Sequence, residues 1–125
     1  MAKPIARLTR RAEFLKVAAA GRRWAAPGLV LQVLRSGVVA SGKPIRLGFT
    51  ASRKVGIAVL RNRARRRLRA AAAEVMPRHA APGHDYVLIA RAATPSRPYS
   101  ALVEDLCTAL RRLGVYQEAV PSDGP

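Results

Sequence analysis

The most constraining feature of this chain is a run of cationic residues between positions 53 and 69. The segment holds eight arginines or lysines among 17 residues and contains no acidic residue. At helical spacing it has one narrow apolar stripe that can pack on a sheet, and cations occupy much of the other side. We therefore expect a helix from about residue 60 to 75, ended by Pro77. The stripe consists of Leu60, Ala64, Leu68, Ala71 and Val75.

The charge on this helix is unfavourable in isolation. Arg61, Arg65 and Arg69 follow one another at i,i+4 spacing, and each like-charge pair destabilises a helix by about 0.2–0.5 kcal/mol. The helix dipole also disfavours cations in the first turn. If this face served only for solubility, glutamate at some of these positions would reduce the repulsion and stabilise the helix. We interpret the face as a binding surface for a polyanion.

The whole chain has the same bias. Its 125 residues suffice for one domain and carry a formal net charge of +16. No apolar run reaches the roughly 18 residues of a membrane span, and the N-terminus lacks the apolar stretch of a signal peptide. The single cysteine, Cys107, excludes an internal disulfide. We expect a cytoplasmic protein with a nucleic-acid partner and no membrane association.

The N-terminal half predicts one helix and two or three strands. Thr9 is a candidate cap for a helix that ends at Gly21, with an apolar stripe of Leu8, Ala12, Leu15 and Ala19. A brief strand around residues 22–24 and a longer one over 29–34 follow. Residues 36–43, with two glycines and two serines, are typical of a hairpin connection.

Residues 45–52 predict a strand with a clean two-residue alternation. One face is expected in the core, and the other is open to solvent or to a ligand. Further along the chain we expect a strand over 86–90, a helix over 98–113 and a disordered tail from 117. The order indicates an α+β sandwich with a mixed sheet and helices mostly on one side. The core face holds Ile45, Leu47, Phe49 and Ala51, and the open face holds Arg46, Gly48, Thr50 and Ser52.

The run from Lys54 through Gly56 to Arg61-Asn62-Arg63 and Arg69 closely resembles the signature of the bacterial ribonuclease P protein family, with its Arg-Asn-Arg motif. The likeness extends to Arg7-Leu8 with Glu13-Phe14, to residues 46–54 and to residues 85–91. It covers roughly residues 7 to 114. The central motif is highly specific, and the outer segments support it.

The resemblance implies an α-β-β-β-α-β-α sandwich, similar to domain 2 of ribosomal protein S5, with a left-handed βαβ crossover. It implies a domain over residues 7–115, preceded by a flexible segment over 1–6 and followed by a disordered tail over 116–125. The protein would be monomeric, with one copy per RNA.

The resemblance also implies roles for individual residues. The start of the cationic helix would bind the catalytic RNA subunit, and a cleft beside the first helix would bind the 5′ leader of precursor tRNA. The family often has aromatic residues where this chain has Ala18 and Gln32, so arginines and polar groups take a larger share of leader binding. The RNA-subunit residues are Arg61, Asn62, Arg63, Arg65, Arg66 and Arg69; the leader residues are Phe14, Val17, Ser52, Arg53 and Lys54, to which our strand alternation adds Arg46 and Thr50.

Catalysis in the family belongs to the RNA subunit, which uses Mg²⁺ to activate water for phosphodiester hydrolysis. The protein would be a subunit of this endoribonuclease, with no catalytic residue and no tightly bound metal of its own. His79, His84 and Asp85 surround a Pro/Gly loop and are interpreted as turn residues. The holoenzyme would remove the 5′ leader from precursor tRNA.

Three other classes share part of this pattern. A ribosomal protein or another RNA-binding module has the same charge and size, but general basic patches lack the Arg-Asn-Arg run joined to Lys54-Val-Gly56. A DNA-architectural protein predicts arms or a dimerisation seam, which the sequence does not show. A protein-only nuclease requires catalytic residues that are not visible here.

Overall fold

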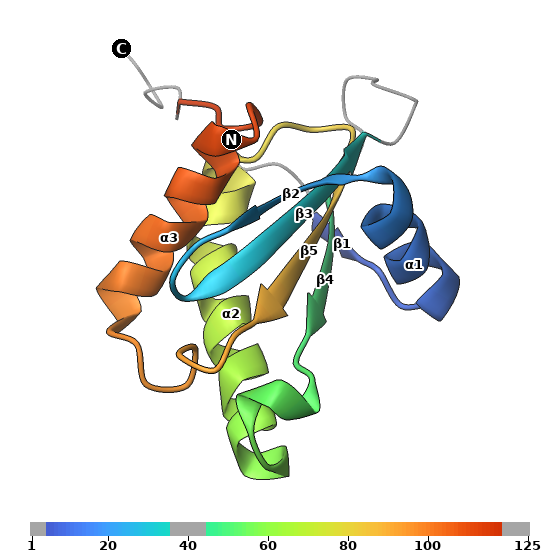
Figure 1. The fold of residues 1–125 in the computed structure, drawn as a ribbon. Helices are drawn as coiled ribbons and strands as arrows, with labels where there is room; N and C mark the ends of the chain where they lie inside the picture. The colour runs from blue at the N-terminus through green and yellow to red at the C-terminus, as the bar shows by residue number, and fades with distance from the viewer. Residues whose placement is uncertain (1–4, 36–44, 119–125) are drawn as a thin grey trace.

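The computed structural model describes residues 5–35 and 45–118. Three helices and a five-stranded sheet account for most of these residues (Figure 1). The elements are β1 (Ile5–Arg7), α1 (Arg11–Ala20), β2 (Arg22–Ala25), β3 (Leu29–Arg35), β4 (Ile45–Thr50), a 3₁₀ turn η1 (Arg53–Val55), α2 (Ala58–His79), β5 (His84–Ala90) and α3 (Tyr99–Arg112).

The sheet is mixed, as predicted, with the strand order β1-β4-β5-β3-β2. Strand β4 runs parallel to both β1 and β5, while β3 runs antiparallel to β2 and β5. The expected hairpin pairing of β3 with β4 is wrong, because β5 lies between them. Residues 36–44, which include the proposed hairpin loop, lie outside the described residues. The left-handed sense of the β4-α2-β5 crossover and the likeness to ribosomal protein S5 remain predictions.

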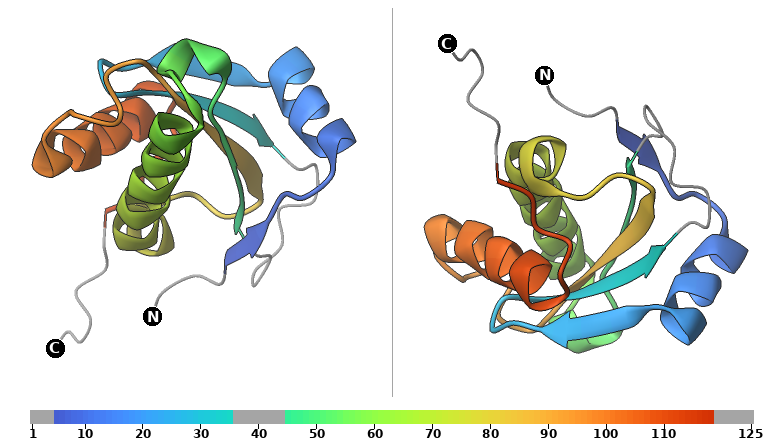
Figure 2. Two further views of the ribbon diagram at one scale, coloured as in Figure 1. Left: turned by 90° about the horizontal axis from the view of Figure 1, so that it is seen from below. Right: turned by 90° about the horizontal axis from the view of Figure 1, so that it is seen from above.

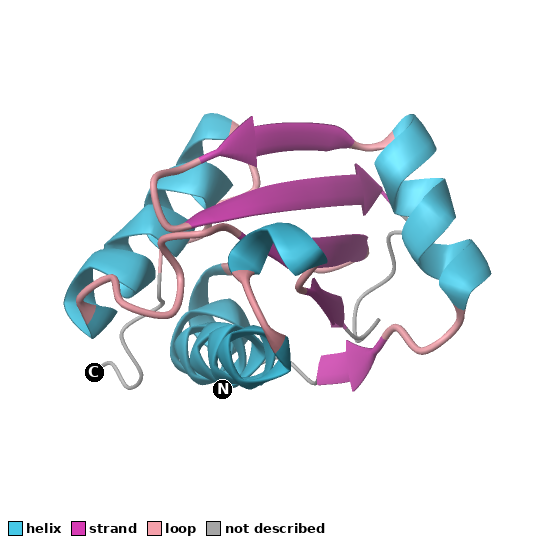
Figure 3. Ribbon diagram, turned by 60° about the horizontal axis from the view of Figure 1, so that its bottom comes forward, coloured by secondary structure: helices cyan, strands magenta, loops and turns pink. Residues whose placement is uncertain are grey.

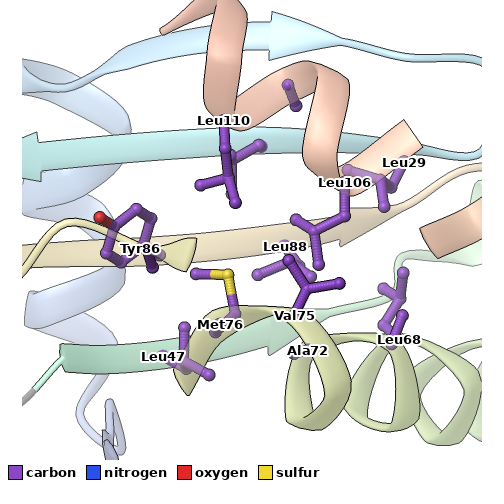
Figure 4. Close-up of a cluster of buried hydrophobic side chains, with 14 of the residues drawn as sticks. Leu29, Leu47, Leu68, Ala72, Val75, Met76, Tyr86, Leu88, Leu106 and Leu110 are labelled. Atoms are coloured by element: carbon purple, nitrogen blue, oxygen red, sulfur yellow. The ribbon is translucent and has the colours of Figure 1, made fainter. Parts of the chain in front are cut away.

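Helices α2 and α3 cover one face of the sheet and α1 lies on the other (Figures 2 and 3). The alternation along β5 makes this possible. Tyr86 and Leu88 belong to the main core under α2 and α3, whereas Val87 packs with Leu8 and Val17 on the α1 side. Figure 4 shows Met76 of α2 and Leu110 of α3 converging on Leu88 in the main core.

The cationic helix is longer than predicted. It begins at Ala58 and ends at His79, so Pro77 lies inside its last turn. Four residues of the expected stripe are buried, but Leu60 is 37 % exposed. The reason is that the first turn of α2 extends past the ends of β4 and β5 (Figure 1), so no strand covers it. The four buried residues are Ala64, Leu68, Ala71 and Val75.

Gly56 makes the turn into this helix. Its φ of 138° is a conformation that side-chain-bearing residues rarely adopt. A Cβ at this position would also lie 2.7 Å from Leu60 Cδ1. The turn itself therefore explains the glycine.

The N-terminal region differs from the prediction in three ways. Residues 5 and 6, expected in a flexible segment, belong to strand β1, which pairs with β4. Helix α1 is capped at Arg10 rather than Thr9, and the Glu13 carboxylate accepts hydrogen bonds from the backbone N–H groups of both residues at 3.0 Å. The helix buries Val17 and leaves Leu15 54 % exposed, so the expected stripe does not form its inner face.

The start of the expected tail is held to the end of α2. Tyr116 forms an isolated β-bridge with Ala80, and its ring stacks on His79 with the centroids 4.8 Å apart. The backbone N–H of Gln117 donates to His79 O at 2.7 Å. Residues 116 and 117 are therefore part of the domain, and residues 119–125 lie outside the described residues.

Candidate nucleic-acid interface

The exposed side of α2 carries most of the residues assigned to RNA-subunit binding. Arg63, Arg66 and Arg69 are exposed, as is Asn62, while Arg61 and Arg65 are half-buried. Among the described residues, no carboxylate forms an ion pair with any of these arginines. The described part of the chain therefore does not neutralise the positive charge of this face.

Asn62 has a structural role within this face. Its Oδ1 accepts a hydrogen bond of 2.7 Å from Arg65 Nη2, one helical turn further on. This contact orients one arginine of the row while leaving the other donors of its guanidinium available. Arg61 Nε is buried and has no hydrogen-bond partner among the described residues.

Two arginines of α2, Arg67 and Arg69, lie at the borders of the face. Arg67 donates to the carbonyl oxygens of Thr94 (3.1 Å) and Arg97, and so fastens the loop before α3. It is a structural residue, and the predicted RNA-binding set does not include it. On the opposite border, the Arg69 guanidinium lies over the Phe49 ring, 5.8 Å from its centroid. Arg69 therefore faces the β1–β4 edge of the sheet.

The second group of predicted residues lies on the α1 side of β4. Phe14 of α1 is half-buried against Gly48, where a Cβ would stand 2.4 Å from Phe14 Cε2. The missing side chain at position 48 thus makes room for the ring. Thr50, two residues along the same face, is half-buried and pairs with Ile89 of β5.

Arg46 is less available than predicted. Its guanidinium forms ion pairs with Glu13 at 2.8 Å and with Asp85 at 3.0 Å. Backbone N–H groups of Arg10 and Thr9, with the nearby Arg46 charge, lower the pKa of Glu13, so this carboxylate is ionised at neutral pH. Arg46 joins α1 to the sheet with its charge already balanced. This pairing accounts for the residue without an RNA ligand.

Val17 is fully buried between α1 and the sheet. It cannot touch a leader directly in this structure, and it supports the face from beneath.

The remaining three residues continue β4 towards α2. Ser52 Oγ accepts from the Lys54 backbone N–H at 3.3 Å and caps η1, while the side chains of Arg53 and Lys54 are exposed.

Other kinds of site find little support in the described part of the chain. No group of three or more His, Cys, Asp or Glu side chains there is arranged to hold a metal ion. Asp85 pairs with Arg46, and His84 Nδ1 lies 2.8 Å from the carbonyl oxygen of Pro82. No helix among residues 5–35 and 45–118 has the length and apolar character needed to cross a membrane.

These features define a small α+β protein with an unneutralised cationic helix face, a class suited to binding a polyanion. Comparisons with known proteins then give the family. The Ribonuclease P family model matches residues 2–114. The ribonuclease P protein component of Paramagnetospirillum magneticum is 52 % identical over 126 residues, covering 100 % of this chain and 95 % of the relative. That of Gluconacetobacter diazotrophicus is 50 % identical, covering 92 % and 97 %.

A solved structure agrees with the fold. The Staphylococcus aureus RNase P protein has a TM-score of 0.71, with 23 % identity and coverage of 89 % of this chain and 97 % of that one. The chain belongs to the bacterial ribonuclease P protein family. It is a subunit of the ribonuclease P holoenzyme and acts in tRNA processing.

Proposed function

We propose that the exposed face of α2 binds the catalytic RNA of ribonuclease P. The observation that carries this proposal is the row of arginines with no carboxylate partner in the described residues. Binding to RNA phosphates would relieve the repulsion within the row and release counterions. Asn62 positions Arg65. The positive charge of the face comes from Arg61, Arg63, Arg65, Arg66 and Arg69.

The α1 side of β4 is proposed to bind the single-stranded 5′ leader of precursor tRNA. Phe14 offers a ring for base stacking, and Arg53 and Lys54, which follow β4, offer exposed charge. Thr50 and Ser52 supply hydroxyl groups, whereas Val17 and Arg46 hold the surface in shape. Leader binding by the protein would direct the holoenzyme to precursor rather than mature tRNA.

The hydrolysis itself is assigned to the RNA subunit, which would hold the Mg²⁺ ions. The protein contributes affinity for the substrate and shields the RNA's own charge, so that less Mg²⁺ is needed. One protein molecule per RNA, in the cytoplasm, completes the proposal.

Reconstitution tests this function. The protein is mixed with a bacterial ribonuclease P RNA at a Mg²⁺ concentration where the RNA alone is nearly inactive. We expect 5′ processing of precursor tRNA to appear on addition of the protein. A rate equal to that of the RNA alone, with protein in excess, would reject the proposal.

Phe14→Ala is expected to reduce the preference for precursor over mature tRNA by about 5-fold or more, because stacking of one base on an aromatic ring contributes about 1–3 kcal/mol. The measurement is the ratio of the two dissociation constants with the reconstituted holoenzyme. Leu15→Ala, an exposed neighbour on the same helix, serves as the control. Equal losses for precursor and mature tRNA would show that Phe14 does not contact the leader.

A further inference from the structure

A small apolar pocket lies between α2 and the β1–β4 edge of the sheet, on the face opposite α1. Its floor is formed by Leu47, Phe49 and Ala72, and its walls by Ile5 and Ala73. Arg7 and Arg69 line it as well and give it a charged rim. The pocket is separate from the proposed leader surface, which is on the other side of β4.

The sequence explains why the pocket exists. β1 extends the sheet at its edge, and besides Arg69 at the rim α2 presents only the small side chains of Ala72 and Ala73 there. Ile5 consequently remains 38 % exposed although its strand is paired. The pocket has a volume of about 160 Å³, close to the roughly 150 Å³ of a cavity that holds benzene. It is thus large enough for one six-membered ring.

The two arginines at the rim indicate that the occupant carries negative charge. Neither Arg7 nor Arg69 forms an ion pair with a carboxylate of the described residues. Arg69 also ends the i,i+4 row that begins at Arg61 and Arg65, whose members follow one another at about 6 Å along the helix axis. A nucleic-acid backbone that follows this row would arrive at the pocket.

We propose that this pocket receives one unstacked RNA base, with a pyrimidine as the better fit, while Arg7 and Arg69 hold an adjacent phosphate. The inference rests on the proposed RNA-binding function of α2 and adds a base-binding site to it. The apolar floor favours a ring, and the two arginines favour an anion directly attached to it. A nucleotide combines these two properties, whereas an apolar peptide segment would leave both arginines without a partner.

Titration of the protein with uridine 5′-monophosphate, followed by the methyl NMR signals of Ile5, Leu47, Ala72 and Ala73, tests the pocket alone. We expect these signals to shift with uridine 5′-monophosphate but not with ribose 5-phosphate. Ala73→Leu, which fills the pocket with a residue that favours helix, should abolish the shifts at Ile5 and Leu47. Ala70→Leu, at an exposed position of the same helix outside the pocket, should leave them unchanged. Equal shifts with the base-free phosphate, or shifts that survive Ala73→Leu, would overturn the proposal.

The same pair of variants tests the pocket in the assembled enzyme. Ala73→Leu is expected to lower the affinity for the ribonuclease P RNA by about 5-fold or more, because the base can no longer enter the pocket. Ala70→Leu should match the unsubstituted protein. If Ala73→Leu binds normally while loss of Arg61 and Arg65 weakens binding, the pocket is rejected and the α2 interface stands. If neither change weakens binding, the α2 interface itself is wrong.

Discussion

Replacing Arg61 and Arg65 together by alanine is expected to lower the affinity for ribonuclease P RNA by about 100-fold or more. Each charge-assisted hydrogen bond contributes about 1.5–3 kcal/mol, and 1.4 kcal/mol corresponds to a factor of ten. Loss of two phosphate contacts should also flatten the slope of log affinity against log salt by about 1.4–1.8, the values for single strands and for a B-form duplex. The measurement is a binding titration at several salt concentrations.

Arg111→Ala with Arg112→Ala is the matched control. It removes two arginines from the last turn of α3, at the opposite end of the molecule from the first turn of α2 (Figure 1). Both variants lose the same charge, so a general field effect would weaken them equally. The α2 interface requires a much larger loss for the Arg61/Arg65 variant, and an unchanged slope for that variant would count against it.

Asp105→Ala is expected to lower the free energy of unfolding by about 3 kcal/mol, and the Tm by roughly 10 °C. The Asp105 carboxylate is buried and accepts hydrogen bonds from Gly28 N–H at 2.9 Å and from Arg97 Nε at 2.5 Å. Its removal leaves a buried N–H and a partly buried guanidinium without their acceptor. Thermal and urea unfolding, followed by circular dichroism, measure the change.

Glu104→Ala provides the comparison, because it removes the same charge from an exposed position of the same helix. A change within about 0.5 kcal/mol is expected there. Comparable destabilisation by the two variants would show that charge on α3, and not the buried contact, determines the effect.

Local patterns predicted the elements of the fold well. In both β4 and α2 the side chains that face the core recur at a regular spacing. That spacing is visible in the sequence. Strand β1 was not predicted, because three residues are too few to show the alternation of a strand. Its position also depends on pairing with β4. The place of β5 between β3 and β4 is likewise a tertiary property.

For a related reason, the sequence predicted some features of the candidate site and missed others. Charge density identified the α2 face, since no other segment concentrates arginine so strongly. Sequence could not show that Arg67 holds the loop before α3 or that Arg46 is paired with Glu13 and Asp85. Those contacts join distant segments. The pocket beside Arg69 also requires β1, which the sequence did not reveal.

The most direct measurement of the central claim observes the arginine side chains themselves. In a protein with ¹⁵N-labelled arginine, the Nε signals are recorded while ribonuclease P RNA, or a fragment that retains binding, is added. We predict that the signals of Arg61, Arg63, Arg65 and Arg66 shift and become protected from exchange, while those of Arg111 and Arg112 do not. Saturated binding with the α2 signals unmoved would contradict the account.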